Sequence, residues 1–253
     1  MPKMRVIAHR GLYWKDYTED GQVKTGRLYR EQSLPSLLVA ALRGLDVEFD
    51  VHSLMSGQAL VHHDKVVVGP SGTVIDIAET KLPILCATGL VGTGPEQIPL
   101  LTDILSSLAW RSHLHIELKG VRSSIATADA LRAVGATTEN LTNVTVSSFA
   151  LSELERFHAQ FPTVELAWLR SSEHVVQPDK LQGVIFNHGI SAVHIPLQDF
   201  TEELAKWYVE TCRVMVRVWT VNDPVVAVNL AHTGLVDGIF TDFANEIRAA
   251  LQN

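Results

Sequence analysis

The sequence lacks several features that would assign it to a class at once. It has only two cysteines, Cys86 and Cys212, and no Cys-x-x-Cys pair, which argues against a disulfide framework and a zinc ribbon. No apolar run is long enough to span a bilayer, and none near the first residue resembles a signal peptide. The net charge is −7, and Lys and Arg form no dense run. We therefore expect a cytoplasmic protein that binds neither nucleic acid nor a membrane surface; the sequence does not indicate its oligomeric state.

The alternation of strand-like and helix-like segments predicts the fold. At 253 residues, with 46% hydrophobic and 19% charged content, the chain can bury one large core. Strands are expected at 6–8, 47–51, 114–118, 144–147, 164–168, 192–195, 214–220 and 238–241. Helices are expected to begin near Ser33, Leu100, Ser123, Ala150, Asp179, Thr201, Pro224 and Ala244. This rhythm is typical of a (β/α)₈ TIM barrel formed by residues 1–253 as one α/β domain; a doubly wound open sheet is the alternative.

Two stretches interrupt this rhythm. Residues 12–30 are polar and form an unusually long connection after the first expected strand. A short insertion after the second strand contains a hairpin-like segment at 66–77 and a Gly- and Thr-rich segment at 88–97. Loops that follow barrel strands surround the active-site face, so residues 12–30 and 88–97 are candidate lids or substrate walls, with plain solvated loops as the alternative.

Carboxylates on two of the expected strands predict a metal site. Side chains at positions i and i+2 of a strand share a face, so Glu48 points the same way as Asp50, and Glu117 the same way as Lys119. Carboxylates that face inward from a buried strand are costly unless they are paired or bind a metal. Two carboxylates on one strand and a third on another can bind one hard divalent cation. A simple ion pair between Glu117 and Lys119 is the alternative for those two residues.

Basic and histidine side chains lie in the same short segments, and their chemistry complements that of a cation. Arg10 and Lys119 can neutralise phosphate oxygens that the cation leaves uncovered. His9, at the end of the first strand, and His63 can move protons. The combination predicts a metal-assisted site that cleaves phosphodiesters.

Three further residues have competing interpretations. Neighbouring strand residues face opposite sides, so His62 and His63 are not both expected at the site. His115 shares a face with Glu117 but would lie deeper in the barrel, so we expect a core histidine. Trp219 could simply pack in the core, because a barrel interior can accommodate a large ring.

An ordered set of motifs resembles the glycerophosphodiester phosphodiesterase family and covers nearly the whole chain. The matching segments are His9-Arg10-Gly11, Glu31-Gln32-Ser33-Leu34, Glu48-Phe49-Asp50-Val51, His63-Asp64, Ile98-Pro99-Leu100-Leu101, Ile116-Glu117-Leu118-Lys119, Ser147-Ser148-Phe149, Trp219-Thr220-Val221-Asn222 and Val236-Asp237-Gly238-Ile239-Phe240-Thr241-Asp242. Two positions depart from the usual pattern. Gln32 replaces Asn and Arg30 replaces Pro, so the start of the first helix could be set differently.

The resemblance implies a TIM barrel that hydrolyses glycerophosphodiesters to glycerol 3-phosphate and an alcohol, with one Mg²⁺ or Ca²⁺ ion. It implies metal ligands at Glu48, Asp50 and Glu117, and an acid–base pair at His9 and His63, with His62 as support. It also implies phosphate contacts from Arg10 and Lys119, an apolar substrate wall at Trp219, and a supporting role for Glu31.

Several alternatives remain open at this point. The nucleophile is either water or the 2-hydroxyl of the substrate glycerol, and either histidine could be the acid. The polar stretch 12–30 could instead serve a lysophospholipase D-like or sphingomyelinase D-like activity on a longer lipid. A barrel that binds phosphate metabolites without catalysis is the alternative from another class. The complete set of acidic, basic and histidine residues argues against it, because a binding protein needs no acid–base pair.

Overall fold

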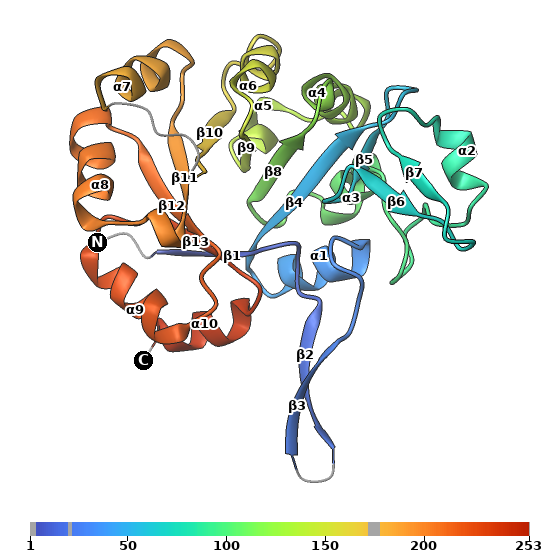
Figure 1. The fold of residues 1–253 in the computed structure, drawn as a ribbon, viewed down its shortest axis with the longest axis horizontal. Coiled ribbons are helices and arrows are strands. Elements are labelled where there is room, and N and C mark those ends of the chain that lie inside the picture. Colours follow the sequence, from blue (N-terminus) through green and yellow to red (C-terminus); the bar gives the residue numbers. More distant parts are fainter. Residues whose placement is uncertain (1–3, 20–21, 172–177, 253) are drawn as a thin grey trace.

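The computed structural model describes residues 4–19, 22–171 and 178–252 and contains a closed barrel of eight parallel strands (Figure 1). The strands are β1 (Arg5–Ala8), β4 (Asp46–Ser53), β8 (Leu114–Lys119), β9 (Val144–Ser148), β10 (Glu165–Leu169), β11 (Ala192–Pro196), β12 (Met215–Trp219) and β13 (Gly238–Thr241). Strand β1 pairs with both β4 and β13, which closes the sheet. The predicted TIM barrel is confirmed, and the open doubly wound sheet is excluded.

Helices follow the strands and cover the barrel from outside, as the sequence predicts. They are α1 (Leu34–Leu42), α3 (Leu101–Leu108), α4 (Ser123–Ala133), α6 (Leu151–His158), α7 (Pro178–Asn187), α8 (Glu202–Trp207), α9 (Pro224–Thr233) and α10 (Ala244–Ala250). Helix α8 continues into a π-helical turn, Tyr208–Cys212, and a short helix that the sequence did not predict, α5 (Thr138–Leu141), precedes β9. Side chains define the predicted starts: Thr201 Oγ1 accepts from the Leu204 amide, and the Asp223 carboxylate caps α9. None of the described helices is long and apolar enough to cross a membrane.

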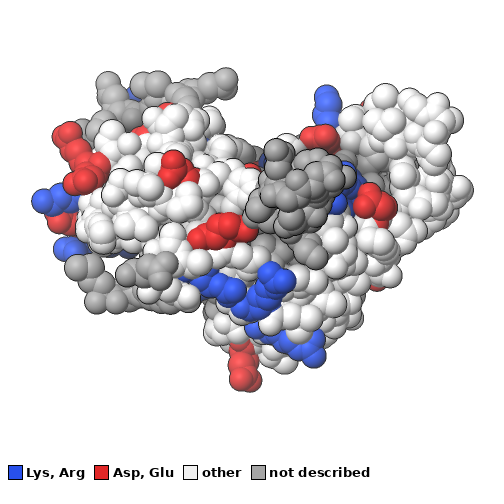
Figure 2. Space-filling view, turned by 90° about the horizontal axis from the view of Figure 1, so that it is seen from below, with Lys and Arg blue, Asp and Glu red and all other residues white. Residues whose placement is uncertain are grey.

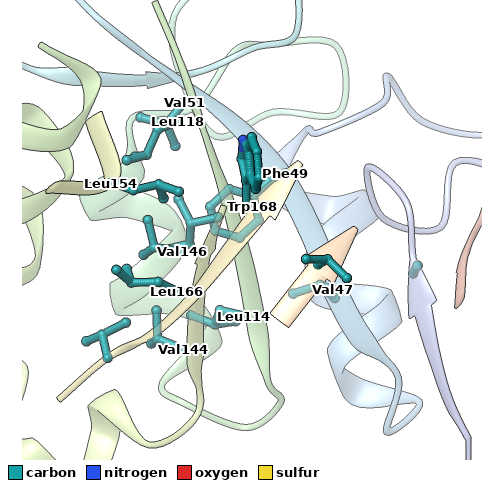
Figure 3. Close-up of a cluster of buried hydrophobic side chains, with 14 of the residues drawn as sticks. Val47, Phe49, Val51, Leu114, Leu118, Val144, Val146, Leu154, Leu166 and Trp168 are labelled. Atoms are coloured by element: carbon teal, nitrogen blue, oxygen red, sulfur yellow. The ribbon is translucent and has the colours of Figure 1, made fainter. Parts of the chain in front are cut away.

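Strand periodicity separates an apolar outer layer from a polar interior. Figure 3 shows the outward residues of neighbouring strands packed together and against helix α6, namely Val47, Phe49, Val51, Leu114, Leu118, Val144, Val146, Leu166, Trp168 and, from the helix, Leu154. The alternate residues of β4 and β8 point into the barrel because successive strand side chains face opposite sides. Glu48, Asp50, His115 and Glu117 therefore become buried polar side chains inside it.

Charged and polar groups fill the barrel at the N-terminal ends of the strands. The guanidinium of Arg217 is 1% exposed and lies between Asp237, at 3.0 Å from Oδ2, and Glu165, at 2.6 Å from Oε1. His115 and His194 are buried above this group, and burial holds the pKa of both rings well below the usual range. They are neutral at pH 7. This layer closes one end of the barrel and leaves the other end open for a site.

The described residues of the connection after β1, 12–19 and 22–30, are structured and do not form the plain loop that their polarity suggested. They contain an antiparallel hairpin, β2 (Trp14–Glu19) and β3 (Gln22–Arg27), that projects from the barrel (Figure 1). The sequence does contain a pattern typical of a hairpin, although the polar composition of the segment obscured it. Residues of high β-propensity flank an Asp-Gly dipeptide at positions 20–21, which is a common hairpin sequence.

The insertion after the second barrel strand is present and has its own small core. It contains β5 (Ala59–Val61), the predicted hairpin as β6 (Val66–Val68) and β7 (Val74–Asp76), and a helix that was not predicted, α2 (Leu82–Cys86). Its core is formed by the buried residues Leu54, Leu60, Val67, Ile77, Leu85 and Ile98. Residues 88–97 contain neither a helix nor a named strand. The loop after β5, which contains His62 and His63, is therefore part of an insertion with its own hydrophobic core.

Most of the face of the molecule seen in Figure 2 is uncharged. Several Lys and Arg side chains lie together in the lower middle of this view, while Asp and Glu side chains lie at separate places. The basic side chains of the described residues therefore cover only a small part of this face.

Candidate active site

A cavity of about 190 Å³ opens at the C-terminal ends of the barrel strands and collects the predicted site residues. It is lined by His9, Arg10, Glu48, Asp50, His63, Glu117, Lys119, Ser147, Phe149, Leu169, His194, Trp219 and Phe240. Every proposed catalytic, metal-binding and phosphate-binding residue is among them. Only the supporting residue Glu31 lies outside, and it contacts the cavity through Arg10.

Three buried carboxylates form the most strongly charged part of the cavity. Oxygens of Glu48, Asp50 and Glu117 lie within 4.8 Å of one another. Strands β4 and β8 are parallel neighbours with Asp50 beside Glu117, so the strand register itself brings the three together. Such an arrangement fits a hard divalent cation that takes oxygen ligands.

Burial and mutual repulsion make this cluster costly without a cation. Burial, then repulsion from Asp50, raises the pKa of Glu117 to about 8. The same two causes, with Glu117 as a further neighbour, raise the pKa of Glu48 well above its usual range. Burial opposes ionisation of Asp50 too, but Lys119 and Arg10 attract its charge and lower its pKa. The donor set therefore fits a cation, because a cation would favour the ionised forms of Glu48 and Glu117 that burial and repulsion disfavour.

Two cationic side chains border the carboxylates. Lys119 Nζ lies 2.6 Å from Glu117 Oε1 and 3.3 Å from Asp50 Oδ1, and these two anions outweigh its burial to raise the pKa of Lys119 to about 12. Arg10 donates from its backbone amide to Glu48 Oε2 at 3.1 Å and from its guanidinium to both oxygens of Glu31 at 3.2 Å. Glu117 and Lys119 do form an ion pair, as the alternative interpretation proposed. That pair lies within the larger cluster and lines the cavity.

Gln32 explains one departure from the family pattern. Its Nε2 donates to Asp50 Oδ2 at 2.5 Å, while its Oε1 accepts from the Asp50 backbone amide at 2.9 Å. The residue is buried and has a left-handed backbone with φ of 58°. Both ends of the amide thus fix Asp50, a role that the sequence analysis did not assign. The longer side chain preserves a hydrogen-bonding amide at the family's Asn position.

His9 is oriented by residues from the far end of the chain. Its Nδ1 lies 2.7 Å from Asp242 Oδ1, and the same oxygen accepts from the Tyr13 hydroxyl at 2.9 Å. Asn222 Nδ2 donates to Asp242 Oδ2 at 2.7 Å. Burial opposes ionisation of Asp242, but these donors, His9 first, lower its pKa to about 2. Asp242 therefore stays charged and holds the Nδ1–H tautomer of His9, which leaves Nε2 available.

The structure places His63, and not its neighbour His62, at the cavity. The His63 side chain is 36% exposed and its Nδ1 lies 2.8 Å from Asp64 Oδ1. The His62 ring is buried away from the cavity, where Nδ1 faces an Arg30 nitrogen at 2.9 Å and Nε2 faces the Val66 carbonyl at 3.1 Å. Burial, then the Arg30 charge, lowers the pKa of His62 to about 4. His62 is thus a neutral ring that supports the loop.

Aromatic and aliphatic side chains form the remaining wall. The rings of Phe149 and Trp219 meet edge to face at 6.0 Å, and Lys119 Nζ lies 5.8 Å from the centre of the Phe149 ring. Trp219 Nε1 is buried and has no hydrogen-bond partner among the described residues. This wall can pack against a small carbon skeleton and keep it beside the charged groups.

The sequence analysis missed the residues that hold the proposed catalytic groups. Tyr13, Asn222 and Asp242 orient His9, Gln32 holds Asp50, and Phe149 extends the Trp219 wall. Four of these lie in segments that the family pattern had already matched. For Phe149 and Asp242, the position directly after a barrel strand would have been the signal.

Comparisons with known proteins agree with this geometry. The profile of the Glycerophosphoryl diester phosphodiesterase family matches residues 9–246. A search of curated proteins found no match.

Solved structures with a similar fold include two glycerophosphodiester phosphodiesterases. The one from Thermotoga maritima has 22% identity and a TM-score of 0.74, covering 98% of each chain. The one from Parabacteroides distasonis has 23% identity and a TM-score of 0.72, covering 99% of this chain and 97% of the other.

A third similar structure contains a reaction product. It is an Oleispira antarctica phosphodiesterase in complex with sn-glycerol-3-phosphate, with 22% identity, a TM-score of 0.76, and coverage of 98% of this chain and 97% of the other. At these identities the structures show the common fold, while the profile match over most of the chain shows its ancestry. The protein belongs to the glycerophosphodiester phosphodiesterase family and is an enzyme of that class.

Proposed function

We propose that the protein hydrolyses glycerophosphodiesters to glycerol 3-phosphate and an alcohol, with one bound Mg²⁺ or Ca²⁺ ion. The observation that carries the proposal is the cluster of Glu48, Asp50 and Glu117 within 4.8 Å, inside a cavity that also presents two cations and two histidines. Carbonyl and carboxylate oxygens suit Mg²⁺ and Ca²⁺, and no sulfur ligand is present in the cluster. The glycerol-3-phosphate complex of the Oleispira antarctica protein supports the choice of substrate.

The three carboxylates would hold the cation, which would polarise the phosphate and lower the pKa of an oxygen nucleophile. Arg10 and Lys119 border the same cluster and would bind the other phosphate oxygens. Their positive charge would stabilise the negative charge that develops on the phosphoryl group in the transition state. Arg10 is paired with Glu31 and Lys119 with Glu117. Each cation would keep this partner and also bind the substrate phosphate.

His9 and His63 would carry out the proton transfers. One ring removes the proton of the nucleophile, and the other protonates the leaving alkoxide. His9 suits either task, because Asp242 binds Nδ1 and leaves Nε2 available. The two histidines come from different loops, one after β1 and one after β5.

The size of the cavity supports a small substrate. Pockets for drug-sized ligands usually enclose about 300–1,000 Å³, whereas this cavity has about 190 Å³. A glycerophosphate group fits such a volume, with its carbon skeleton against Trp219 and Phe149. The head group would extend toward the solvent.

A substrate panel tests the proposal. The purified protein would be dialysed against chelator and assayed with glycerophosphocholine, glycerophosphoethanolamine, glycerophosphoglycerol and a lysophospholipid, each with Mg²⁺, Ca²⁺ or chelator. We expect release of glycerol 3-phosphate from the first three substrates only when a cation is present. Full activity in excess chelator would contradict the metal site, and activity on the lysophospholipid alone would contradict the substrate class.

Variants of the three carboxylates connect the cation to the named residues. Glu48→Gln, Asp50→Asn and Glu117→Gln should each weaken cation binding in isothermal titration calorimetry and reduce turnover. Glu139→Gln, on the exposed surface, is the matched control and should change neither. Retention of cation affinity in all three site variants would place the metal elsewhere.

A further inference from the structure

Tyr13 connects the projecting hairpin to the proposed acid–base residue His9. It stands immediately before β2 and is 7% exposed. Its backbone carbonyl accepts from the Leu28 amide at 2.7 Å, just after β3, so the residue lies at the closed base of the hairpin. Its hydroxyl crosses to the other end of the chain and donates to Asp242 Oδ1 at 2.9 Å.

The Asp242 carboxylate is held on both oxygens. Oδ1 accepts hydrogen bonds from His9 Nδ1 at 2.7 Å and from the Tyr13 hydroxyl at 2.9 Å. Oδ2 accepts a hydrogen bond from Asn222 Nδ2 at 2.7 Å. Asn222 also accepts from the Asp242 backbone amide at 2.9 Å. These contacts fix the plane of the carboxylate and therefore the direction of the bond to His9 Nδ1.

We propose that Tyr13 is a positioning residue that acts through Asp242 to aim the His9 ring at the reacting oxygen. The inference rests on the proposed function, because it assigns His9 an acid–base task. Tyr13 touches neither the carboxylate cluster nor the cavity wall, so it is not itself a catalytic residue. Burial and the Asp242 charge raise the pKa of Tyr13, which keeps its hydroxyl protonated and able to donate.

Loss of the hydroxyl has a specific expected consequence. Without the Tyr13 hydroxyl, only His9 among the described residues bonds to Oδ1 and only Asn222 bonds to Oδ2, so the carboxylate is held less tightly against rotation about its Cβ–Cγ bond. The imidazole would then sample orientations in which Nε2 points away from the substrate. This affects the proton-transfer step and leaves substrate and cation binding unchanged.

Tyr13→Phe isolates this effect. The ring remains to fill its buried position, and the hairpin contact uses the backbone carbonyl, which the substitution keeps. Tyr29→Phe is the matched control, because Tyr29 follows the same hairpin and its hydroxyl has no partner among the described residues. On a substrate that the wild type hydrolyses, we expect Tyr13→Phe to lower kcat about tenfold, with KM and cation affinity within twofold of wild type. An unchanged kcat would overturn the proposal, as would a loss confined to KM.

A double-mutant cycle tests the route through Asp242. In the Asp242→Asn background, Tyr13→Phe should cost less than twofold in kcat, because the oriented carboxylate is already gone. A full tenfold loss in that background would show that Tyr13 acts by another path and overturn the proposal.

A spectroscopic measurement needs no substrate and separates this inference from the proposed function. The His9 Nδ1–H resonance would be followed by nuclear magnetic resonance in ¹⁵N-labelled protein and assigned by its absence in His9→Ala. We expect Tyr13→Phe to shift it and Tyr29→Phe to leave it unchanged. If the resonance shifts in Tyr13→Phe but the wild-type protein does not hydrolyse glycerophosphodiesters, the link from Tyr13 to His9 is supported and the proposed function is contradicted. An unshifted resonance would overturn the link even if turnover is normal.

Discussion

Asp50 belongs to the carboxylate cluster and faces both cations of the cavity, and its surroundings explain how such a cluster folds. Lys119 and Arg10 lower its pKa, while Gln32 binds both its side chain and its backbone amide. Glu48 and Glu117 have less compensation, and burial raises their pKa values. A bound cation would compensate the burial of these carboxylates, which is why we assign the cation to this cluster.

The two histidines allow a test at the residue scale. His9→Ala and His63→Ala should each lower kcat by about 10²–10⁴, because general acid–base groups typically contribute that much. Calorimetric cation affinity and the circular dichroism spectrum should remain close to wild type, since neither ring is among the three clustered carboxylates. The double variant should lose much less than the product of the single losses, because both groups serve one transition state.

His62→Ala is the control for this pair. His62 bonds to Arg30 and Val66 outside the cavity, so we expect lower stability and a far smaller loss of kcat. Equal losses from His62→Ala and His63→Ala would refute the assignment of His63. Near-normal kcat in both His9→Ala and His63→Ala would refute the proton relay.

At the scale of elements, the junction between β1 and α1 determines how the site is assembled. The chain turns sharply after Ala8, where the Gly11 amide donates to the Ala8 carbonyl at 3.1 Å and Leu12 binds Ser36 of α1. Gly11 has φ of +85°, and a Cβ there would lie 2.8 Å from the Ser36 backbone carbon. This close approach directs the Arg10 backbone amide to Glu48. Glycine is thus required by both conformation and space.

Gly11→Ala tests this junction. We expect it to lower the free energy of unfolding by about 1–3 kcal/mol more than Gly57→Ala does, because both positions have positive φ but only Gly11 lacks room for a methyl group. Chemical denaturation measures the difference. The Gly11→Ala enzyme should also lose activity as Arg10 shifts. Equal destabilisation by the two variants would mean that the contact with α1 relaxes without cost.

At the scale of the whole molecule, the barrel interior has two polar layers with opposite roles. In the lower layer every charged side chain has a partner: Arg217 is paired with Asp237 and Glu165, and the histidines above it are neutral. The upper layer holds three clustered carboxylates, two of which have raised pKa values, and lies in the open cavity. The fold therefore satisfies its polar interior at one end and leaves, at the other end, the carboxylate cluster to which we assign a cation.

This asymmetry predicts how the stability of the cation-free protein changes with pH. Glu117 has a pKa of about 8 in the folded protein and about 4.5 when unfolded. The native state thus retains a proton that the unfolded chain has released, so this contribution to stability is complete below pH 4.5 and disappears as the pH rises through 8. Between pH 7 and 8, the free energy of unfolding should fall by ~1 kcal/mol in chelator.

Chemical denaturation at several pH values measures this slope. Glu117→Gln should reduce the slope, because one of the two carboxylates with raised pKa values is gone and only Glu48 remains. Mg²⁺ or Ca²⁺ should restore stability at pH 8 in the wild type and much less in Glu117→Gln, because a ligand that binds only the folded state stabilises it. The buried histidines His115 and His194 do not affect the measurement between pH 7 and 8. Because their pKa values are lowered in the folded protein, they reduce its stability only below about pH 6.5. A chelated protein that gains stability from pH 7 to 8 would contradict this prediction.

Local sequence patterns determined the barrel and most of its site. Strand alternation placed Val47, Phe49 and Val51 outside and Glu48 and Asp50 inside, which the structure confirms. Helix starts were predictable where the sequence has a typical N-cap residue, as at Thr201 and Asp223. The hairpin before α1 was missed because its polar composition outweighed its alternation, and α2 and α5 were missed because helices of four or five residues carry little periodic signal.

Only the tertiary structure decided which distant residues meet. Asp242 lies 233 positions from His9, and no local pattern can reveal that contact, because it forms only when β13 pairs with β1 to close the barrel. The same closure brings Tyr13 to Asp242, while the pairing of β4 with β8 sets Asp50 beside Glu117. The sequence by itself specified which residue types face inward and which segments begin and end the elements. The register of the closed sheet, a property of all eight strands together, specified which of those side chains share a cavity and which hold the others in place.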